Sequence, residues 1–100
     1  MFMATQNQMI DPNWRSLTTT KRDILIALGA HGPLTGAELT RGIPDIHEKR
    51  VYKHLPDLRE QGLVTYQGNR NARKNDLTDA GNELLFRALS KKLRNIATDA

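Results

Sequence analysis

The stretch DIHEKRVYKHLPDLREQGLV, residues 45–64, has the periodicity and the end signals of one amphipathic helix. Three aliphatic residues recur at the spacing of one helical face: Val51, Leu55 and Leu58. Asp45 and Glu48 are spaced as a capping box, and Gly62 is a residue type that ends helices in the left-handed conformation. Pro56 removes one backbone hydrogen bond from the helix interior. We therefore expect a continuous helix over residues 45–61, kinked at the proline.

The first two turns of this helix carry cations away from the apolar stripe. At roughly 100° per residue, Lys49 and Lys53 fall opposite the stripe and Arg50 falls beside it. Tyr52 lies on the flank, where its hydroxyl can donate to a phosphate. A basic helix fits the major groove of DNA, whose width admits one α-helix. The alternative is an ordinary surface helix with lysines on its solvated face. The neighbouring segments are needed to decide between a DNA-binding helix and this alternative.

An earlier helix is expected over residues 18–30. The hydroxyls of residues 18–20, TTT, are available as N-caps. Its core-facing residues follow helical spacing: Leu17, Ile24, Leu25 and Leu28. Ile26 points the other way, and Gly29, Gly32 and Pro33 are expected to end the helix.

A short helix should follow over residues 36–41. Thr35 and Glu38 have the spacing of a second capping box, and Gly42 is expected to end the helix. Thr35 could also present backbone N–H groups to a phosphate. This short helix and the basic helix after it, joined by a tight turn, form a helix-turn-helix pattern.

Residues 63–78 have the composition of a β-hairpin. LVTYQ, residues 63–67, is rich in β-formers, and NDLT, residues 75–78, reads as a short returning strand. The connecting segment, residues 68–74, contains turn-forming residues and three cations: Arg70, Arg73 and Lys74. These cations would reach the DNA backbone or the adjacent minor groove. Asn69 and Asn71 are interpreted as turn residues.

The last helix, from its N-cap Thr78 to about residue 97, has a wider apolar arc than one core contact needs. Phe86 widens the arc further. The simplest cover is the same helix of a second chain. The residues expected at that contact are Leu85, Leu89, Leu93 and Ile96. Packing against Ile26 within a monomer is the alternative.

Length and composition indicate one globular domain. The chain has 100 residues, 38% of them hydrophobic, and a formal net charge of +4. We expect a flexible leader over residues 1–13, a DNA-binding domain over 14–78 and a dimerisation element over 79–100. Cysteine is absent, and no apolar run reaches the roughly 18 residues of a membrane span. Residues 1–13 lack the features of a signal peptide, so a cytoplasmic location is expected.

The order of helix, helix, basic helix, basic hairpin and helix is that of a winged-helix domain. Over about residues 14–90 the sequence resembles the PadR family of winged-helix transcription regulators, most of all its archaeal members. The resemblance is carried by LTTTKRDILIALGAHGPLTGAEL, RVYKHLPDLREQGLV and DLTDAGNELL. It implies a mainly α fold with a small β-hairpin (α+β): a winged helix-turn-helix with a C-terminal dimerisation helix. It also implies a dimeric regulator, usually a repressor.

Sequence-specific binding of double-stranded DNA is the expected function, with the helix over 45–61 in the major groove and the wing over 63–78 on the backbone or minor groove. The expected DNA contacts are Lys49, Arg50, Tyr52, Lys53, Arg70, Arg73, Lys74 and Thr35. Arg50 is the candidate for bidentate reading of guanine. The alternative is a winged-helix adaptor that binds an acidic protein and no DNA.

Catalysis and metal binding have no candidate residues in the sequence. There is no glycine-rich phosphate loop and no nucleophile elbow, so we do not expect an enzyme or a cofactor. His47 and His54 lie seven residues apart, too far for the i, i+4 pair of a zinc helix, and are expected to pack at the edge of the core. His31 is expected in a loop. A small-molecule effector cannot be read from the sequence.

Overall fold

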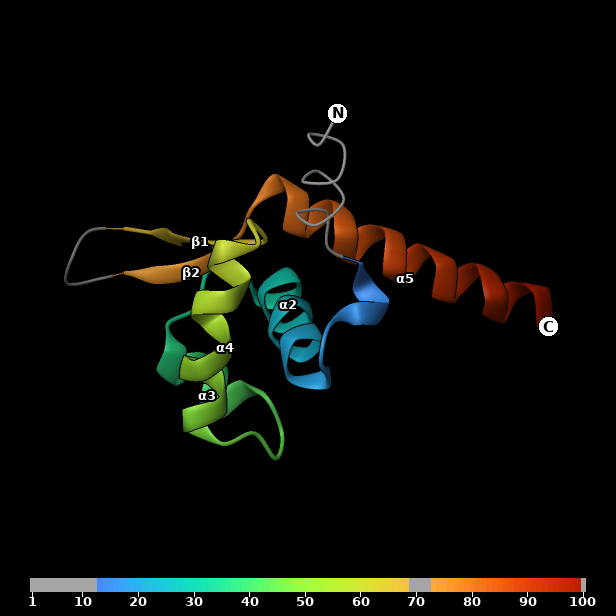
Figure 1. Cartoon of the computed structure of the whole chain (residues 1–100). Coiled ribbons are helices and arrows are strands. Elements are labelled where there is room, and N and C mark those ends of the chain that lie inside the picture. The colour runs from blue at the N-terminus through green and yellow to red at the C-terminus, as the bar shows by residue number, and fades with distance from the viewer. Residues whose placement is uncertain (1–12, 69–72, 100) are drawn as a thin grey trace.

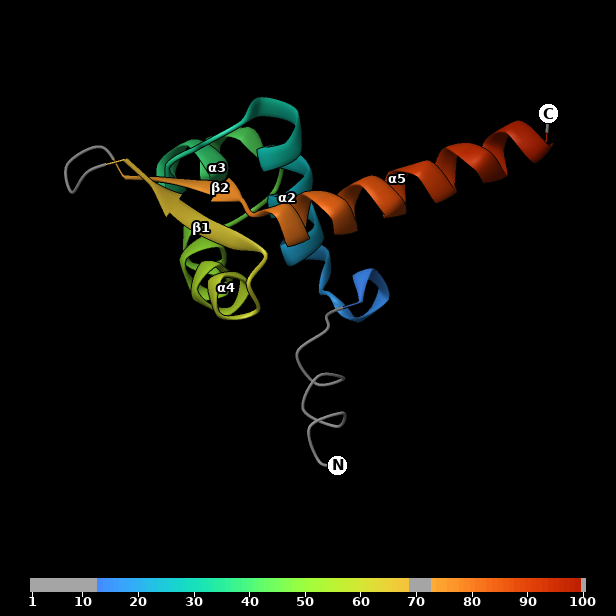
Figure 2. The same cartoon turned by 90° about the horizontal axis from the view of Figure 1, so that it is seen from above.

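The computed structural model describes residues 13–68 and 73–99, and for residues 92–99 it describes the backbone helix alone. The elements follow in the order η1 (Trp14–Ser16), α2 (Thr19–His31), α3 (Gly36–Gly42), α4 (Glu48–Glu60), β1 (Val64–Gln67), β2 (Lys74–Leu77) and α5 (Asp79–Asp99). Helices α2, α3 and α4 group together, while the hairpin and α5 leave this group in opposite directions (Figures 1 and 2). The fold is the expected winged helix, mainly α with one antiparallel hairpin.

The core consists of the aliphatic stripes that the sequence pattern predicts. Ile24, Leu25 and Leu28 of α2 are fully or almost fully buried. They belong to one cluster with residues of α3, α4 and the hairpin: Leu39, Val51, Leu55, Leu58, Leu63 and Val64. The periodicity of the sequence therefore identified the buried faces of α2 and α4 correctly.

Three of the four expected helix caps are confirmed, those of α2, α3 and α5. The Thr18 hydroxyl accepts the N–H of Lys21 at 3.2 Å, so Thr18 caps α2. At α3, the Thr35 hydroxyl accepts the N–H of Glu38 at 3.1 Å, and the Glu38 carboxylate accepts the N–H of Thr35 at 2.8 Å. This reciprocal pair is the expected capping box.

The predicted capping box of α4 is wrong, and the helix begins three residues later than expected. Its N-cap is His47, whose Nδ1 accepts the N–H of Lys49 at 3.2 Å. Asp45 has a φ of 60°, a left-handed backbone that Asp adopts more readily than most residues. This turn keeps Asp45 outside the helix, so Glu48 becomes the first helical residue.

Helix α4 is continuous through Pro56, as expected, and ends in a Schellman motif. Gly62, with a φ of 78°, donates its N–H to the Arg59 carbonyl at 3.0 Å. Leu63 donates to the Leu58 carbonyl at 3.0 Å. These two bonds satisfy carbonyl groups at the end of the helix, and they require the left-handed glycine that the sequence indicated.

Helix α2 runs one residue beyond its predicted end, so His31 is its last residue and lies in no loop. Gly32, with a φ of 81°, is the C-cap. Gly29 lies inside the helix and does not end it. A Cβ at Gly29 would overlap the Leu85 side chain of α5. Gly29 therefore permits close packing of α5 on α2, a role that the local sequence did not indicate.

The hairpin is confirmed, and a third chain segment joins its second strand. Val64 of β1 pairs with Leu77 of β2, and Gln67 pairs with Lys74. Leu34, in the connection between α2 and α3, forms an isolated antiparallel bridge with Asn75. The two residues exchange both backbone hydrogen bonds, at 2.9 and 2.7 Å. This bridge fixes the hairpin to the helical core, a contact between distant residues that the local sequence does not indicate.

Helix α5 begins on the predicted cap. The Thr78 hydroxyl accepts the N–H of Gly81 at 3.0 Å and donates to the Gly62 carbonyl. A Cβ at Gly81 would overlap the Leu63 carbonyl, so the start of α5 lies directly on the connection between α4 and β1. Within residues 13–68 and 73–99, no helix is both long and apolar enough to cross a membrane.

Candidate nucleic-acid interface

The first two turns of α4 expose the three cations predicted for the major groove. Lys49, Arg50 and Lys53 are all exposed. None of them forms an ion pair with another residue in the described part of the chain. Glu48 adds one carboxylate at the helix start, where the helix dipole favours negative charge. The leading half of α4 is therefore a solvated surface with net positive charge.

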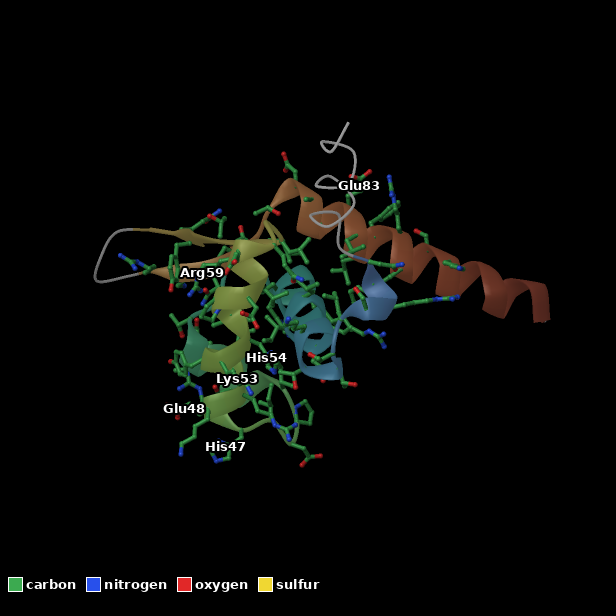
Figure 3. The ribbon with its side chains drawn as sticks, in the orientation of Figure 1. His47, Glu48, Lys53, His54, Arg59 and Glu83 are labelled. Carbon is green, nitrogen blue, oxygen red and sulfur yellow. The ribbon has the colours of Figure 1, made fainter. Side chains whose placement is uncertain are left out.

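In the second half of α4, two charged residues contact other elements of the same chain. The Asp57 carboxylate lies 3.6 Å from the Lys21 ammonium of α2. Arg59 is half-buried and donates from Nη1 to the Asn75 Oδ1 of β2 at 3.2 Å. Figure 3 shows His47 and Glu48 at the start of α4 and Arg59 at its other end beside the hairpin. The helix therefore presents one end to solvent and is anchored by the other.

Thr35 and Tyr52 lie close to the start of α3. The N–H of Thr35 donates and its hydroxyl oxygen accepts within the capping box, which leaves the O–H hydrogen able to donate to a phosphate. Tyr52 is 51% exposed, and its ring packs against Gly36 so closely that a Cβ there would overlap it. Tyr52 therefore joins α4 to α3 while part of its side chain remains accessible.

Two of the three predicted wing cations are described, and both are exposed: Arg73 and Lys74. Arg70 lies outside the described residues, as do Asn69 and Asn71. The pKa of Glu38 is lowered, first by its hydrogen bond from the Thr35 N–H and also by the nearby charge of Lys74. Lys74 therefore lies near α3, and Arg73 adds a second positive charge to the exposed surface of the hairpin.

Tyr66, Arg59 and Asn75 are residues of this region that the sequence reading missed. The guanidinium carbon of Arg59 lies 4.2 Å from the centroid of the Tyr66 ring, and that of Arg73 lies 4.6 Å from it. Asn75 is 4% exposed. The only sequence signal was the alternation of Val64 and Tyr66, which places both side chains on one face of the strand. Val64 is buried in the core, whereas Tyr66 is 44% exposed.

His54 packs at the edge of the core, as expected, whereas His47, expected there too, is exposed and caps α4. Its Nδ1 is buried and has no hydrogen-bond partner in the described structure. Burial lowers the pKa of His54, and the charges of Lys21, Lys53 and Arg50 lower it further, while Asp57 opposes them. Figure 3 shows His54 on the side of α4 that faces α2. The described residues contain no group of three or more His, Cys, Asp and Glu able to hold a metal ion.

The residues predicted for dimerisation fall into three groups. Leu85 is 5% exposed and packs on Gly29 of its own chain, so it belongs to the monomer core. Leu89 is 44% exposed and Phe86 70% exposed. The side chains of Leu93 and Ile96 lie outside the described part of α5.

Packing of α5 against Ile26, the monomeric alternative, is not what the structure shows. Ile26 is 41% exposed. It lines a hollow of about 380 Å³ between α2 and the segment that follows α3, with Asp23, Ala27, Ala30, His31, Gly42, Ile43 and Pro44. The described side chains of α5, up to residue 91, do not contribute to this lining, and α5 packs on α2 through Leu85 and Gly29 instead.

Solved structures with the same arrangement include RosR and a MarR family protein. RosR of H. salinarum matches with 26% identity and a TM-score of 0.75, covering 86% of this chain and 83% of that one. A complex structure of RosR gives 26% identity, a TM-score of 0.76, and coverage of 86% and 79%. A MarR family protein from Bacillus stearothermophilus gives 19% identity, a TM-score of 0.76, and coverage of 95% of this chain and 66% of that one. The chain thus spans just under two thirds of this MarR protein.

The chain has the winged-helix fold of transcription regulators. No protein-family model and no curated protein sequence matches it. The structural neighbours are RosR and MarR family proteins, and PadR is a different winged-helix family. The expected resemblance is thus supported for the winged-helix regulator class and not for PadR itself.

Acid should destabilise the protein through His54. Its lowered pKa means that the unfolded chain binds a proton more readily as pH falls below about 6.5. The contribution of the neutral His54 to the free energy of unfolding is therefore fully present above that pH and is lost as the pH falls. We expect the free energy of unfolding, measured with urea, to fall less between about pH 8 and about pH 5 in His54→Gln than in the wild type. His31→Gln, at an exposed position, should keep the wild-type fall. Equal falls in all three proteins would contradict this role of His54.

Proposed function

We propose that this protein is a sequence-specific, double-stranded DNA-binding transcription regulator. In this proposal the first two turns of α4 enter the major groove, and the wing, residues 63–78, contacts the backbone or the adjacent minor groove. A repressor role is proposed with it, because a protein that occupies DNA can block transcription.

The observation that carries the proposal is the free positive charge of α4. Lys49, Arg50 and Lys53 are exposed and have no ion-pair partner among the described residues, whereas Asp57 is paired with Lys21. An exposed helix with unneutralised cations is suited to the phosphate-lined major groove. The similarity to RosR and MarR structures further supports a DNA-binding role.

The wing supplies the second contact in this proposal. Arg73 and Lys74 are exposed on the hairpin, and Arg59 brings the end of α4 to the same hairpin. The hairpin and α4 lie on the opposite side of the domain from the C-terminal end of α5 (Figures 1 and 2). One duplex could therefore meet both elements without approaching that end of α5. An adaptor for an acidic protein would not need a cation on the wing as well as on α4.

In this proposal α4 reads bases, and both α4 and the wing contact the DNA backbone. Arg50 can form two parallel hydrogen bonds with guanine, which specify a base pair. Lys49, Lys53 and Arg73 neutralise phosphates, which gives affinity without sequence preference. Tyr52, 51% exposed as a residue, donates a hydrogen bond from its hydroxyl to a phosphate at the edge of the groove.

A homodimer completes the proposal, with α5 and the residues after it as the dimerisation element. Phe86 and Leu89 are three residues apart on α5, so they share one face, and both are substantially exposed. Burial of this face in a second copy would remove apolar surface from water. A twofold dimer would place two α4 helices on half-sites one helical turn, or a multiple of it, apart.

Arg73→Ala should weaken binding to every duplex and flatten its salt dependence. The slope of log affinity against log salt should become shallower by about 0.9 if one phosphate contact is lost. Arg50→Ala should instead reduce the preference for one base pair, by about 1–3 kcal/mol. Fluorescence anisotropy would measure both, with a duplex selected from random DNA and a random duplex.

Arg87→Ala is the matched control, because Arg87 is an exposed arginine that pairs with Glu83 on α5. It should leave the salt slope and the base preference unchanged. The division of roles is wrong if Arg50→Ala and Arg73→Ala change binding to the two duplexes in the same way. Absence of wild-type binding at low salt would favour the adaptor function.

Substitution of the exposed apolar face of α5 should separate the dimer. Sedimentation equilibrium of the wild type should give about twice the 11.3 kDa chain mass. Phe86→Ser combined with Leu89→Ser should give the mass of one chain, because the contact loses its apolar side chains. Arg87→Ala, on the same helix, should remain dimeric. A wild-type mass of one chain would contradict the proposed dimer.

A further inference from the structure

The Tyr66 ring contacts two guanidinium groups that come from different elements. Arg59 belongs to the last turn of α4, and Arg73 precedes β2 on the wing. Their guanidinium carbons lie 4.2 Å and 4.6 Å from the ring centroid. Both distances are well inside the range of about 6 Å in which a cation over an aromatic ring is attracted to its face. Tyr66 therefore links the end of α4 to a cation of the wing.

The guanidinium of Arg59 is held in place by a hydrogen bond to β2. Its Nη1 donates to the Asn75 Oδ1 at 3.2 Å, and the Asn75 amide donates to the Leu34 carbonyl at 3.2 Å. Asn75 is 4% exposed. The guanidinium of Arg59 is thus held by a buried group, and Tyr66 in turn packs on a side chain with little freedom to move.

The guanidinium of Arg73, on the other hand, is available to a binding partner. Arg73 is exposed, and its guanidinium forms no ion pair with a described residue. Stacking uses the flat face of a guanidinium and leaves the N–H groups at its edge able to donate. Two cations on one ring also repel each other. An anion that accepted hydrogen bonds from Arg73 would relieve that repulsion, and a phosphate has the oxygens to do so.

We propose that Tyr66 is a positioning residue for DNA binding: its ring, held by Arg59, keeps the Arg73 guanidinium in place for a backbone phosphate. The inference rests on the proposed DNA-binding function. An unstacked arginine must lose its rotamer freedom when it binds, whereas a stacked one has lost part of it already. Tyr66 thereby increases affinity without touching DNA.

A double-mutant cycle on the full-length protein tests this role. Affinity for one selected duplex would be measured for the wild type, Tyr66→Phe, Tyr66→Leu, Arg73→Ala and the combination of the last two. Tyr66→Leu should weaken binding about two- to fivefold, the range of an exposed cation–π contact. Tyr66→Phe keeps the ring and should bind like the wild type. Tyr66→Leu should cost nothing more once Arg73 is alanine.

Thr65→Val is the matched control on the same strand, because Thr65 is exposed and pairs with Asp76. It should bind like the wild type. An equal loss from Tyr66→Leu with and without Arg73 would overturn the inference, since the ring would then act independently of that arginine. A loss from Tyr66→Phe as large as that from Tyr66→Leu would overturn it too.

A measurement without DNA separates this inference from the proposed function. Nitrogen relaxation at the Arg73 Nε reports how freely its side chain moves. The wild type and Tyr66→Phe should show a restricted Nε, and Tyr66→Leu a mobile one. A mobile Nε in the wild type would overturn the inference whether or not DNA binds. A restricted Nε in a protein that binds no duplex would refute the proposed function and, with it, the positioning role.

Discussion

The buried side chain of Asn75 joins the three parts of the domain on which the candidate interface depends. Its backbone exchanges two hydrogen bonds with Leu34, its amide donates to the Leu34 carbonyl, and its Oδ1 accepts from Arg59. It therefore connects the wing to the α2–α3 connection and to the end of α4. A buried polar group left without partners costs about 1–3 kcal/mol, so an alternative register of the hairpin is disfavoured.

This connection explains why the cations in the first two turns of α4 can remain exposed without ion-pair partners in the described part of the chain. The helix is anchored at its far end by Arg59, along its length by the aliphatic stripe, and to α2 by the pair of Asp57 with Lys21. Its first turns need no further internal contacts. The cations there remain in water, where they can exchange solvent and counterions for a phosphate-bearing partner.

The sequence predicted what depends on near neighbours in the chain. The buried faces of α2 and α4 follow from helical spacing, and the caps at Thr18 and Thr35 follow from short-range hydrogen bonding. The start of α4 was predicted wrongly because two patterns overlap: Asp45 fits a capping box, but its left-handed backbone makes His47 the cap.

Contacts between distant residues could not be predicted in the same way. Nothing near Gly29 in the sequence indicates that Leu85 packs on it, so Leu85 was expected to face a second chain. The contact of Tyr66 with Arg59 depends on where α4 ends relative to the hairpin. The wide apolar arc of α5 is thus divided: Leu85 faces the chain's own core, and Phe86 and Leu89 remain exposed.

The central claim is that α4 and the wing form one DNA-facing surface. Amide chemical shifts of the nitrogen-labelled protein, recorded during titration with a duplex, test it most directly. We expect the largest changes in the first two turns of α4 and in the wing near Arg73, with little change around Arg87 and Lys91 of α5. Changes centred on α5 with α4 unaffected would contradict the account.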